Sequence, residues 1–588
     1  MFAAPGLITH PATLLVMTAI VAGLMVLSAR RLNTPWPALA LFALPCLALL
    51  LDTDILYGTW HANLHASVVN SIIQSGIPPE NPLLAGEPLR YPYGQHILVA
   101  ALSAGLGIPA AWVFWALTLL SLPLVMFLLD RIACLYDDDT TFRLLGVLCG
   151  LTLLFAAGYG PLQNLLRELW VQHLGFRNEF RFLPFVKFTT QNGSPVGFVM
   201  FLMTFLGVSR LLIGRGGRLG ATLLAASGVV GAGLLYPFAW LMAGLAVGLG
   251  VLTGLWMHWR SPTSMERRVL ILLLGIGLLG LTPLPYLLDA SSGKSGDAAL
   301  LVLPWLSYPL QQASNLALVL ALPILLTLLN PGPVRSMLGR QRAVSALLLM
   351  TATGGLFAYV LLAAPDRVEY KIASLAFLIL GLVLAAALAP WARTRVALFW
   401  LLTALCVHPM LNRVASQMHY QYVDRTVRVD GRPMARDPGE AELLTWARDH
   451  TPSDAVFVDR HRTLPPIAGR PLYVGFNPRQ ERPTQFQRSP KPHDGWGMAS
   501  DMFLSRVSGA PATLIAGRRS AARTLWQSDH PGDRLKALRY IQAEMSPRPV
   551  YVVARTEEAR KRLDATPGVK AEFSNETASA YRLEPDRH

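Results

Sequence analysis

Charged residues are scarce in this sequence. Only 15% of the 588 residues are Asp, Glu, Lys or Arg, whereas a soluble protein usually carries about a quarter. The shortage falls on one part of the chain: residues 1–412 hold 23 basic and 15 acidic side chains, and the shorter segment 413–588 holds 28 and 21. A wholly soluble protein is excluded. We predict an α-helical polytopic membrane domain over 1–412 and a soluble α/β domain over 413–588.

Cysteine is also scarce. The four cysteines, at positions 46, 134, 149 and 406, lie within or beside apolar runs, and the chain has no Cys-x-x-Cys pair. No disulfide framework is therefore expected. The first apolar run, 8–29, is too long for a signal peptide and lacks its basic start and small-residue cleavage site, so we expect it to be retained as a membrane span.

Long apolar runs, by contrast, are abundant. A membrane-spanning helix needs roughly 20 mostly apolar residues, and we predict about 12 such helices. They lie near residues 8–29, 35–51, 110–129, 142–158, 195–213, 219–235, 237–257, 268–287, 309–329, 343–363, 372–390 and 396–411. One further run, 94–106, is too short to span comfortably and is typical of an interfacial or re-entrant helix.

The net charge of +15 does not indicate a nucleic-acid partner, because the basic residues of 1–412 mostly fill short loops between spans. Every second loop is basic, which is typical of cytoplasmic loops. These loops contain Arg30, Arg31, Arg131, Arg143, Arg210, Arg215, Arg218, Arg260, Arg267, Arg268, Arg335, Arg340, Arg342, Arg393 and Arg395. Segments 52–109, 159–194, 288–308, 364–371 and everything after 412 then face outside, which in a Gram-negative cell means the periplasm.

The first external loop, 52–109, is rich in functional residue types. It opens with Asp52 and Asp54 at the end of a span, and an amphipathic helix is expected over 56–75. His61 and His65 share one face of this helix. The next stretch, "GIPPENPLLAGEPLRYPYGQH" (76–96), combines prolines and glycines with acidic and aromatic residues. We predict an ordered loop with fixed turns.

Residues 71–103, "SIIQSGIPPENPLLAGEPLRYPYGQHILVAALS", together with the preceding aspartates, resemble the integral membrane glycosyltransferases of the GT-C superfamily. They are especially similar to bacterial and archaeal "YYY" membrane proteins, whose loop runs through Ala-Gly-Glu-Pro-Leu and a tyrosine-rich stretch to Gly-x-His. The segment "AGEPLRYPYGQH" departs from this pattern at Arg90 and Pro92. The match covers about 45 residues, and elsewhere only the general layout agrees.

This resemblance implies an inverting transferase that uses a polyprenyl-phosphate-linked sugar and a glycan, lipid or protein acceptor in the inner membrane. An acidic residue of the first external loop would be the general base or would position the acceptor, and Asp52 and Asp54 match it. Asp54 is favoured because it is further from the apolar span. The expected substrate-binding residues are His61, His65, Glu87, Tyr91, Tyr93 and His96.

A metal site in the same loop is a second expectation. Two histidines at positions i and i+4 can share a metal, so Asp54, His61 and His65 are candidate ligands of a divalent metal. The alternatives are that the histidines only form hydrogen bonds and that the aspartates are polar residues at a helix end. Some GT-C enzymes need a divalent metal and others do not, so the cofactor stays open.

Two other external segments supply cations. The second external loop contains Arg177, Arg181 and Lys187 among aromatic residues, and the turn "PDRVEYK" contains Arg367 and Lys371. Positive charge stabilises a departing phosphate, so we predict that these residues converge on one donor-phosphate site. Nonspecific binding of anionic lipid and snorkelling of Arg367 and Lys371 are the alternatives.

The C-terminal segment alternates between helical and strand patterns. Helices are predicted over 439–450 and 532–545, and strands over 455–459, 471–475, 550–555 and 579–583. The polar, proline-rich stretch 477–500 is expected to be a loop over the membrane-side cavity or a plain surface loop.

Two functions from different classes fit these observations. The first is the membrane glycosyltransferase, and the second is a transporter or flippase of lipid-linked saccharides. A transporter usually carries ionisable residues near the middle of the membrane and internal repeats. The predicted spans are nearly free of charge and show no repeat, which favours the transferase.

Overall fold

The computed structural model describes residues 60–108, 110–156, 194–260, 262–291, 323–361, 370–394, 438–461, 463–476 and 510–584, together with residues 313, 316, 320 and 504. The chain forms two compact units. Unit 1 consists of Met1–Thr53, Trp115–Leu287 and Ala298–Asp424, and unit 2 consists of Asp54–Phe114, Leu288–Asp297 and Arg425–His588. The first external loop therefore belongs to the same unit as the C-terminal domain. The predicted boundary at 412 lies outside the described residues.

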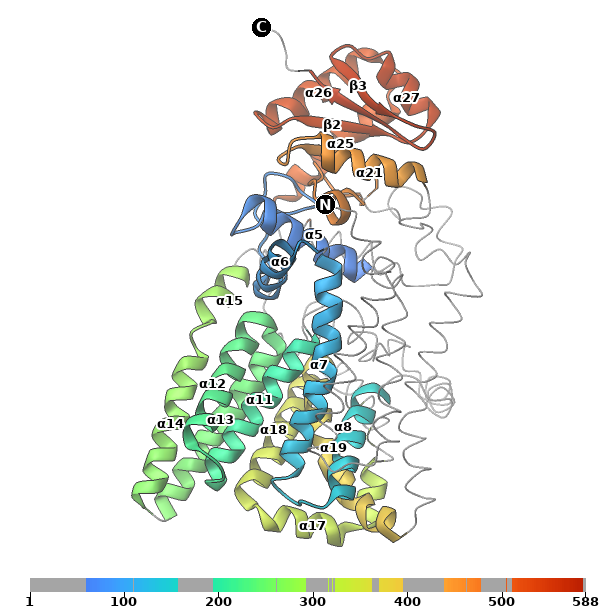
Figure 1. Cartoon of the computed structure of the whole chain (residues 1–588). Coiled ribbons are helices and arrows are strands. Elements are labelled where there is room, and N and C mark those ends of the chain that lie inside the picture. The colour runs from blue at the N-terminus through green and yellow to red at the C-terminus, as the bar shows by residue number, and fades with distance from the viewer. Residues whose placement is uncertain are drawn as a thin grey trace. The chain divides into compact units, whose positions relative to one another are not determined.

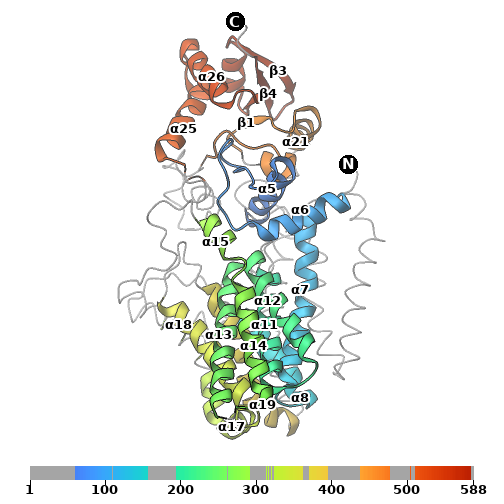
Figure 2. The same cartoon turned by 90° about the vertical axis from the view of Figure 1, so that its left-hand side faces the viewer.

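The described part of unit 1 is helical. Its helices are α7 (Ala110–Ala133), which starts in unit 2, α8 (Thr140–Ala156), α11 (Ser194–Ile213), α12 (Arg218–Leu235), α13 (Pro237–Arg260), α14 (Ser264–Gly280), α15 (Leu284–Ser291), which ends in unit 2, α17 (Pro331–Arg340), α18 (Arg342–Leu361) and α19 (Tyr370–Thr394). Helices α11, α12, α13 and α14 lie side by side, and α18 packs against α13 and α19 (Figures 1 and 2).

Seven helical segments of the described residues are long and apolar enough to cross a membrane. They are Ala116–Ala133, Ser194–Ile213, Arg218–Leu235, Pro237–Arg260, Ser264–Ala290, Arg342–Leu361 and Lys371–Thr394. Each matches a predicted span, and the chain is a multi-pass membrane protein. The total of about 12 is not established: α8 is shorter, 309–329 is described only in part, and 8–29, 35–51 and 396–411 lie outside the described residues.

Local sequence explains where several of these helices begin and break. Thr263 and Glu266 form a capping box at the start of α14, in which each side chain accepts a hydrogen bond from the other residue's backbone N–H. The span 264–290 is interrupted between α14 and α15, where Pro283 has no backbone N–H to continue the helix. Pro237, in contrast, occupies the first position of α13, which tolerates proline.

Glycines permit close helix packing in the bundle. A Cβ atom added to Gly381 of α19 would lie 2.2 Å from the backbone nitrogen of Gly150 in α8. One added to Gly207 of α11 would lie 2.6 Å from the backbone oxygen of Ala221 in α12. Membrane helices commonly approach each other through such small residues, because packing rather than hydrophobic burial drives their association.

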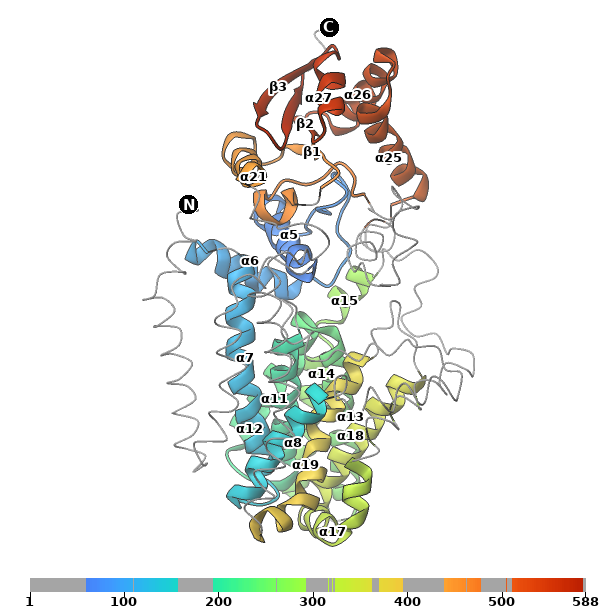
Figure 3. The ribbon, with the colours of Figure 1, turned by 90° about the vertical axis from the view of Figure 1, so that its right-hand side faces the viewer.

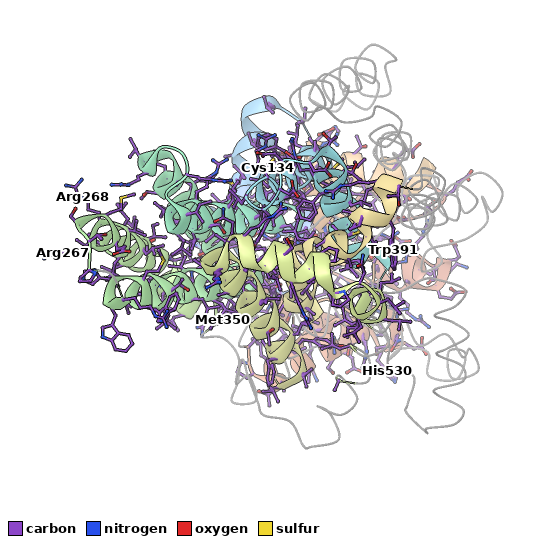
Figure 4. The ribbon with its side chains drawn as sticks, turned by 90° about the horizontal axis from the view of Figure 1, so that it is seen from below. Cys134, Arg267, Arg268, Met350, Trp391 and His530 are labelled. Carbon is purple, nitrogen blue, oxygen red and sulfur yellow. The ribbon has the colours of Figure 1, made fainter. Side chains whose placement is uncertain are left out.

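Charged side chains gather at the helix ends of the basic-loop side. Asp130 is buried and forms a two-pronged ion pair with Arg143. Asp137 pairs with Arg340 and Asp139 pairs with Arg393, so the acidic 137–139 turn joins α17 and α19. Viewed from below, Arg267 and Arg268 project from the outer side of α14 (Figure 4).

The C-terminal part of unit 2 is a small α/β domain, as predicted. Its elements are α21 (Pro438–His450), β1 (Val456–Val458), the single turn η3 (Leu464–Ala468), α25 (Ala512–Gln527), α26 (Pro531–Met545), β2 (Val550–Ala554), α27 (Glu557–Asp564), β3 (Val569–Ser574) and β4 (Ser579–Leu583). The strand order is β1-β2-β4-β3, with β1 parallel to β2 and the other two pairs antiparallel.

Helices cover both faces of this sheet (Figure 3). Tyr551 of β2 packs edge-on against Trp446 of α21. Its neighbour Val552 lies opposite Tyr581, whose hydroxyl donates to Asp564 of α27. Successive residues of a strand point to opposite faces, so α21 and α27 lie on opposite sides. Buried aromatic and aliphatic side chains from both faces form the core.

Most of the predicted elements of this domain are confirmed. The two predicted helices correspond to α21 and α26, and three predicted strands correspond to β1, β2 and β4. The predicted strand 471–475 is wrong as a strand of the sheet, because it forms only one parallel bridge, between Leu472 and Phe457. Helices α25 and α27 and strand β3 were not predicted, and loop 477–500 lies outside the described residues.

Candidate functional site

The described part of the candidate site lies in unit 2, in two helices and the loop between them. Helix α5 (Trp60–Ser75) is the amphipathic helix expected over 56–75, and α6 (Gly94–Leu106) is the short helix expected over 94–106. The sequence signals for both were their apolar patterns and the flanking prolines and glycines. The two helices pack against each other, which brings His65 and His96 together across 31 residues.

His65 and His96 form a buried pair. Nδ1 of His65 lies 2.8 Å from Nε2 of His96, within hydrogen-bond distance, and the two side chains are only 5% and 3% exposed. Phe114 and Tyr91 lie around them, each with a ring centroid 5.8 Å from that of His96. Within the described part of the chain, Nδ1 of His96 is buried without a hydrogen-bond partner.

Burial decides the protonation of His96. Desolvation lowers the pKa of His96 from 6.5 to about 3, so the ring is neutral at physiological pH. Desolvation, reinforced by the carboxylate of Asp289, raises the pKa of Tyr93, so that phenol stays protonated. The described aromatic part of the loop thus provides neutral hydrogen-bonding groups rather than charges.

The loop between the helices has fixed turns, as predicted. Gly76 and Gly86 have φ values of +82° and +81°, a region that other residues adopt only with strain. Asn81 donates its backbone N–H to Glu87 O at 2.8 Å, and Leu89 donates to Pro79 O at 2.8 Å, so the chain doubles back on itself. The half-buried Glu87 lies at this reversal, beside Gly86.

The reversed loop extends the edge of the C-terminal domain. Segment 471–475 bonds to β1 on one side, where Tyr473 N donates to Phe457 O. On its other side Leu472 N donates to Pro82 O, and Ala85 N donates to Leu472 O. The segment predicted as a strand is therefore shared between the sheet and the first external loop, with one parallel bridge to β1.

Two arginines of the C-terminal domain hold the loop in place. Arg518 is 3% exposed and donates to the backbone oxygens of Ala85 (2.6 Å) and Tyr473 (3.1 Å). Its Nε donates to the half-buried Glu544 at 2.7 Å, which completes an ion pair. Arg548 pairs with Glu80, whose carboxylate also accepts the backbone N–H of Gly86. Residues so far apart in the sequence leave no local signal of their contact, and neither arginine was predicted.

Helix α5 is attached to the same domain. The side-chain amide of Asn70 donates to the backbone oxygens of Pro465 (3.0 Å) and Pro466 (2.9 Å) in the η3 turn. The last turns of α5 carry serines that bond to the loop: Ser71 Oγ donates to Glu80 O at 2.6 Å. The start of the motif-bearing loop is thus attached to a helix that itself packs on the η3 turn of the C-terminal domain, and α6 at the end of the loop packs on that same helix.

In unit 1, Lys371 stands at the start of α19. Its Nζ lies 4.7 Å from the ring centroid of Phe238 and 5.8 Å from that of Tyr236. The hydroxyl of Tyr236 accepts a 2.8 Å hydrogen bond from Ser194, the last residue of the predicted second external loop and the first of α11. The cation therefore lies over two aromatic rings next to the point where that loop joins α11.

The other predicted site residues fall outside what the structure describes. These are Asp52, Asp54, Arg177, Arg181, Lys187 and Arg367, and for His61 only its place in α5 is described. The convergence of the five cations therefore stays a prediction. The described residues include no group of three His, Cys, Asp or Glu side chains arranged to hold a metal. Because His65 Nδ1 contacts His96, a metal at His65 would have to bind Nε2.

No protein-family model matches the chain, and no curated protein matches it. Solved structures to which it is similar include ArnT from Cupriavidus metallidurans bound to undecaprenyl phosphate, with 12% identity, 92% of this chain and 97% of that chain covered, and a TM-score of 0.49. Mycobacterial arabinofuranosyltransferase AftD has 15% identity, with 90% and 40% covered and a TM-score of 0.48. The Archaeoglobus fulgidus oligosaccharyltransferase with Zn and sulfate has 10% identity, with 93% and 74% covered and a TM-score of 0.42. Likenesses at this level do not by themselves assign an activity to this chain.

Proposed function

We propose that this protein is an integral membrane glycosyltransferase of the GT-C type. It transfers a sugar from a polyprenyl-phosphate-linked donor to an acceptor at the external face of the membrane. The observation that carries the proposal is the loop 76–96. Its sequence resembles the hallmark loop of such enzymes, and its backbone is held in one shape by Arg518, Arg548 and Glu80.

The chemistry requires a base and a cation. Asp54, or Asp52, accepts the proton of the acceptor hydroxyl as its oxygen attacks the anomeric carbon of the donor sugar. A carbon–oxygen bond to the acceptor forms, and the bond from the anomeric carbon to the phosphate oxygen breaks with inversion. The lipid phosphate leaves as an anion, which is stabilised by basic residues. Lys371, Arg177, Arg181, Lys187 and Arg367 are the proposed donors to that phosphate.

The buried histidine pair suits a positioning role in this scheme. His65 lies one turn after His61 and on the same helix face, close in sequence to the proposed base. His96 is neutral at physiological pH, so it holds His65 through a hydrogen bond without adding charge. Glu87, Tyr91 and Tyr93 are proposed to contact the sugar or the acceptor directly.

The distribution of charge in the described helices supports an enzyme over a transporter. In α7, α8, α11, α12, α13, α14, α18 and α19, every Asp, Glu, Lys, Arg and His lies within five residues of a helix end. A substrate pathway through the bilayer would need ionisable groups near the midplane. The described helices therefore give no support to the flippase alternative, which the test below distinguishes from the transferase.

The test is sugar transfer by purified protein in proteoliposomes, with a radiolabelled polyprenyl-phosphate sugar and a membrane extract as the source of acceptor. Asp54→Asn keeps the shape of the side chain and removes the base, so the rate should fall by ~10²–10⁴-fold. Asp529→Asn, at an exposed site in unit 2, is the control. Near-normal transfer in both Asp54→Asn and Asp52→Asn would overturn the proposed mechanism, and lipid translocation without transfer would favour the flippase.

A further inference from the structure

A pocket with a mixed apolar and polar lining lies within unit 2, between α5 and the C-terminal domain. It has a volume of about 330 Å³, at the lower end of the range for small-molecule sites, which is about 300–1,000 Å³. Helix α5 contributes one face of side chains, and the remainder comes from the loop after α5 and from the C-terminal domain. The lining residues are Ser67, Ser71, Gln74, Ser75, Glu80, Pro82, Ser453, Asp454, Pro465, Gly469, Pro471 and Arg548.

Three of these side chains offer hydrogen-bonding groups that the described protein does not use. They are the amide of Gln74, the hydroxyl of Ser453 and the carboxylate of Asp454, all of which are exposed. Ser71 and Ser75, in contrast, are bonded to each other and to the backbone of Glu80. The three available groups come from two segments that are far apart in sequence, so the fold alone brings them together.

The close approach of Gln74 depends on a glycine. Gly469 has a φ of +71°, and a Cβ atom there would lie 2.3 Å from Nε2 of Gln74. A side chain at position 469 would therefore displace the amide from the pocket. The absence of that side chain leaves room for both the amide and a ligand.

The charges of the lining select among ligand classes. It contains two carboxylates, Glu80 and Asp454, and one guanidinium, Arg548, whose charge is already paired with Glu80. A phosphate or another anion would meet two carboxylates against one guanidinium, which is unfavourable. Within the described part of the chain the carboxylate of Asp454 forms no ion pair, although it interacts electrostatically with the buried Arg470. A lipid tail would leave the amide, hydroxyl and carboxylate buried without partners.

A carbohydrate avoids both problems, because it need not carry negative charge and it offers hydrogen-bonding groups to the amide, the hydroxyl and the carboxylate. Its adjacent hydroxyls can donate to a carboxylate and exchange hydrogen bonds with an amide and a serine. Its C–H faces can pack on the prolines of the wall, Pro82, Pro465 and Pro471. We propose that this pocket binds a neutral or amino-substituted saccharide unit. The further assignment of that unit to the acceptor rests on the proposed function, whereas the binding site itself does not.

The test is saturation-transfer difference NMR on the full chain in nanodiscs, with a panel of neutral and amino-substituted methyl glycosides as probes. Ser453→Trp fills the pocket from an exposed position, so it should leave the fold intact. Ser520→Trp, at an exposed position on α25 that does not line the pocket, is the matched control. We expect a saturable NMR signal of binding for at least one glycoside. This signal should be lost in Ser453→Trp, kept in Ser520→Trp and unaffected by inorganic phosphate.

Three results would overturn the proposal: no saturable glycoside binding, equal binding by Ser453→Trp, or displacement of the glycoside by phosphate. Sugar transfer assayed on the same samples separates this inference from the proposed function. Wild-type protein that transfers sugar but binds no glycoside refutes the pocket alone. Protein that binds glycoside but transfers no sugar refutes the proposed function and leaves the saccharide site standing.

Discussion

Arginines have different partners in the two units. In unit 1, Arg340 and Arg393 lie at helix ends, are 54% and 42% exposed, and pair with aspartates of one acidic turn. In unit 2, Arg518 is almost fully buried and donates to backbone oxygens of two segments without regular structure. Arg470, also buried, donates to the backbone oxygens of Arg448 and Thr451 at the C-terminal end of α21.

The difference follows from what each unit must satisfy. Membrane helices satisfy their own backbone groups, so arginine is left to mark the membrane boundary. The irregular segments of unit 2 leave carbonyls that no helix or sheet pairs, and a buried carbonyl without a donor is costly. Arginine, with five donors on one planar group, can satisfy several of them at once. Removal of a buried, backbone-bonded arginine of unit 2 should therefore cost much more than removal of an exposed arginine at a helix end of unit 1.

The largest effect is expected for Arg518→Ala. The substitution removes the ion-pair partner of the half-buried Glu544, which keeps its bond from the hydroxyl of Tyr473, and it leaves the backbone oxygens of Ala85 and Tyr473 without their arginine donor. A buried acceptor left unsatisfied costs about 1–3 kcal/mol, so unit 2 should lose roughly 3 kcal/mol of stability. Thermal unfolding of the detergent-solubilised chain measures this loss. Arg523→Ala on the same helix is the control, because the structure shows no side-chain hydrogen bond for Arg523 among the described residues. Equal melting temperatures for the two variants would contradict the comparison.

A smaller loss is expected for Arg548→Ala. Arg548 and Glu80 are only 21% and 18% exposed, and Glu80 also accepts the N–H of Gly86. Hydrogen bonds to charged groups contribute about 1.5–3 kcal/mol, and partial exposure places the loss toward the lower end. Limited proteolysis within residues 76–93 measures whether the loop is released. Glu80→Gln keeps the contact with Gly86, so it should be cut more slowly than Arg548→Ala. Faster cutting of Glu80→Gln than of Arg548→Ala would count against the ion pair.

Acid should weaken unit 2 through His96. The unfolded ring binds a proton below its ordinary pKa of 6.5, whereas the folded ring stays neutral until about pH 3. The contribution is thus present in full above pH 6.5 and is lost as the pH falls toward 3. Between pH 7 and pH 5 the wild type should lose about 2 kcal/mol more than His96→Gln. Denaturant titrations at the two pH values test this, and equal losses in both proteins would refute the buried neutral state.

The smallest effect is expected for Arg393→Ala in unit 1. Its partner Asp139 is 34% exposed, and surface ion pairs contribute about 0.2–1 kcal/mol. Arg143→Ala in the same unit is the informative contrast, since it leaves Asp130 buried after removing the two-pronged pair. Thermal unfolding should separate the two variants clearly. A large fall in the melting temperature of Arg393→Ala would show that the exposure of an arginine does not decide its contribution to stability in this protein.

Much of the fold could be predicted from the sequence. Seven membrane-spanning segments, the short helix 94–106 and the helix near 56–75 all follow from apolar runs and their periodicity, which are local properties of the chain. The turns of loop 76–93 follow from its glycines and prolines in the same way. Strand β3 was missed because its exposed, polar pattern resembles a loop, and it becomes a strand only by pairing with β4.

The sequence by itself determined the membrane character of the chain, the approximate positions of its apolar helices and the segment that carries the glycosyltransferase resemblance. Only the tertiary structure decided that this segment belongs with the C-terminal domain. It also decided that His65 meets His96, that Arg518 holds Ala85, and that Gln74 shares a pocket with Asp454. The physical reason is that helix formation depends on neighbours within one or two turns. These contacts, in contrast, join residues 31 to 433 positions apart, and nothing in either local sequence specifies its partner.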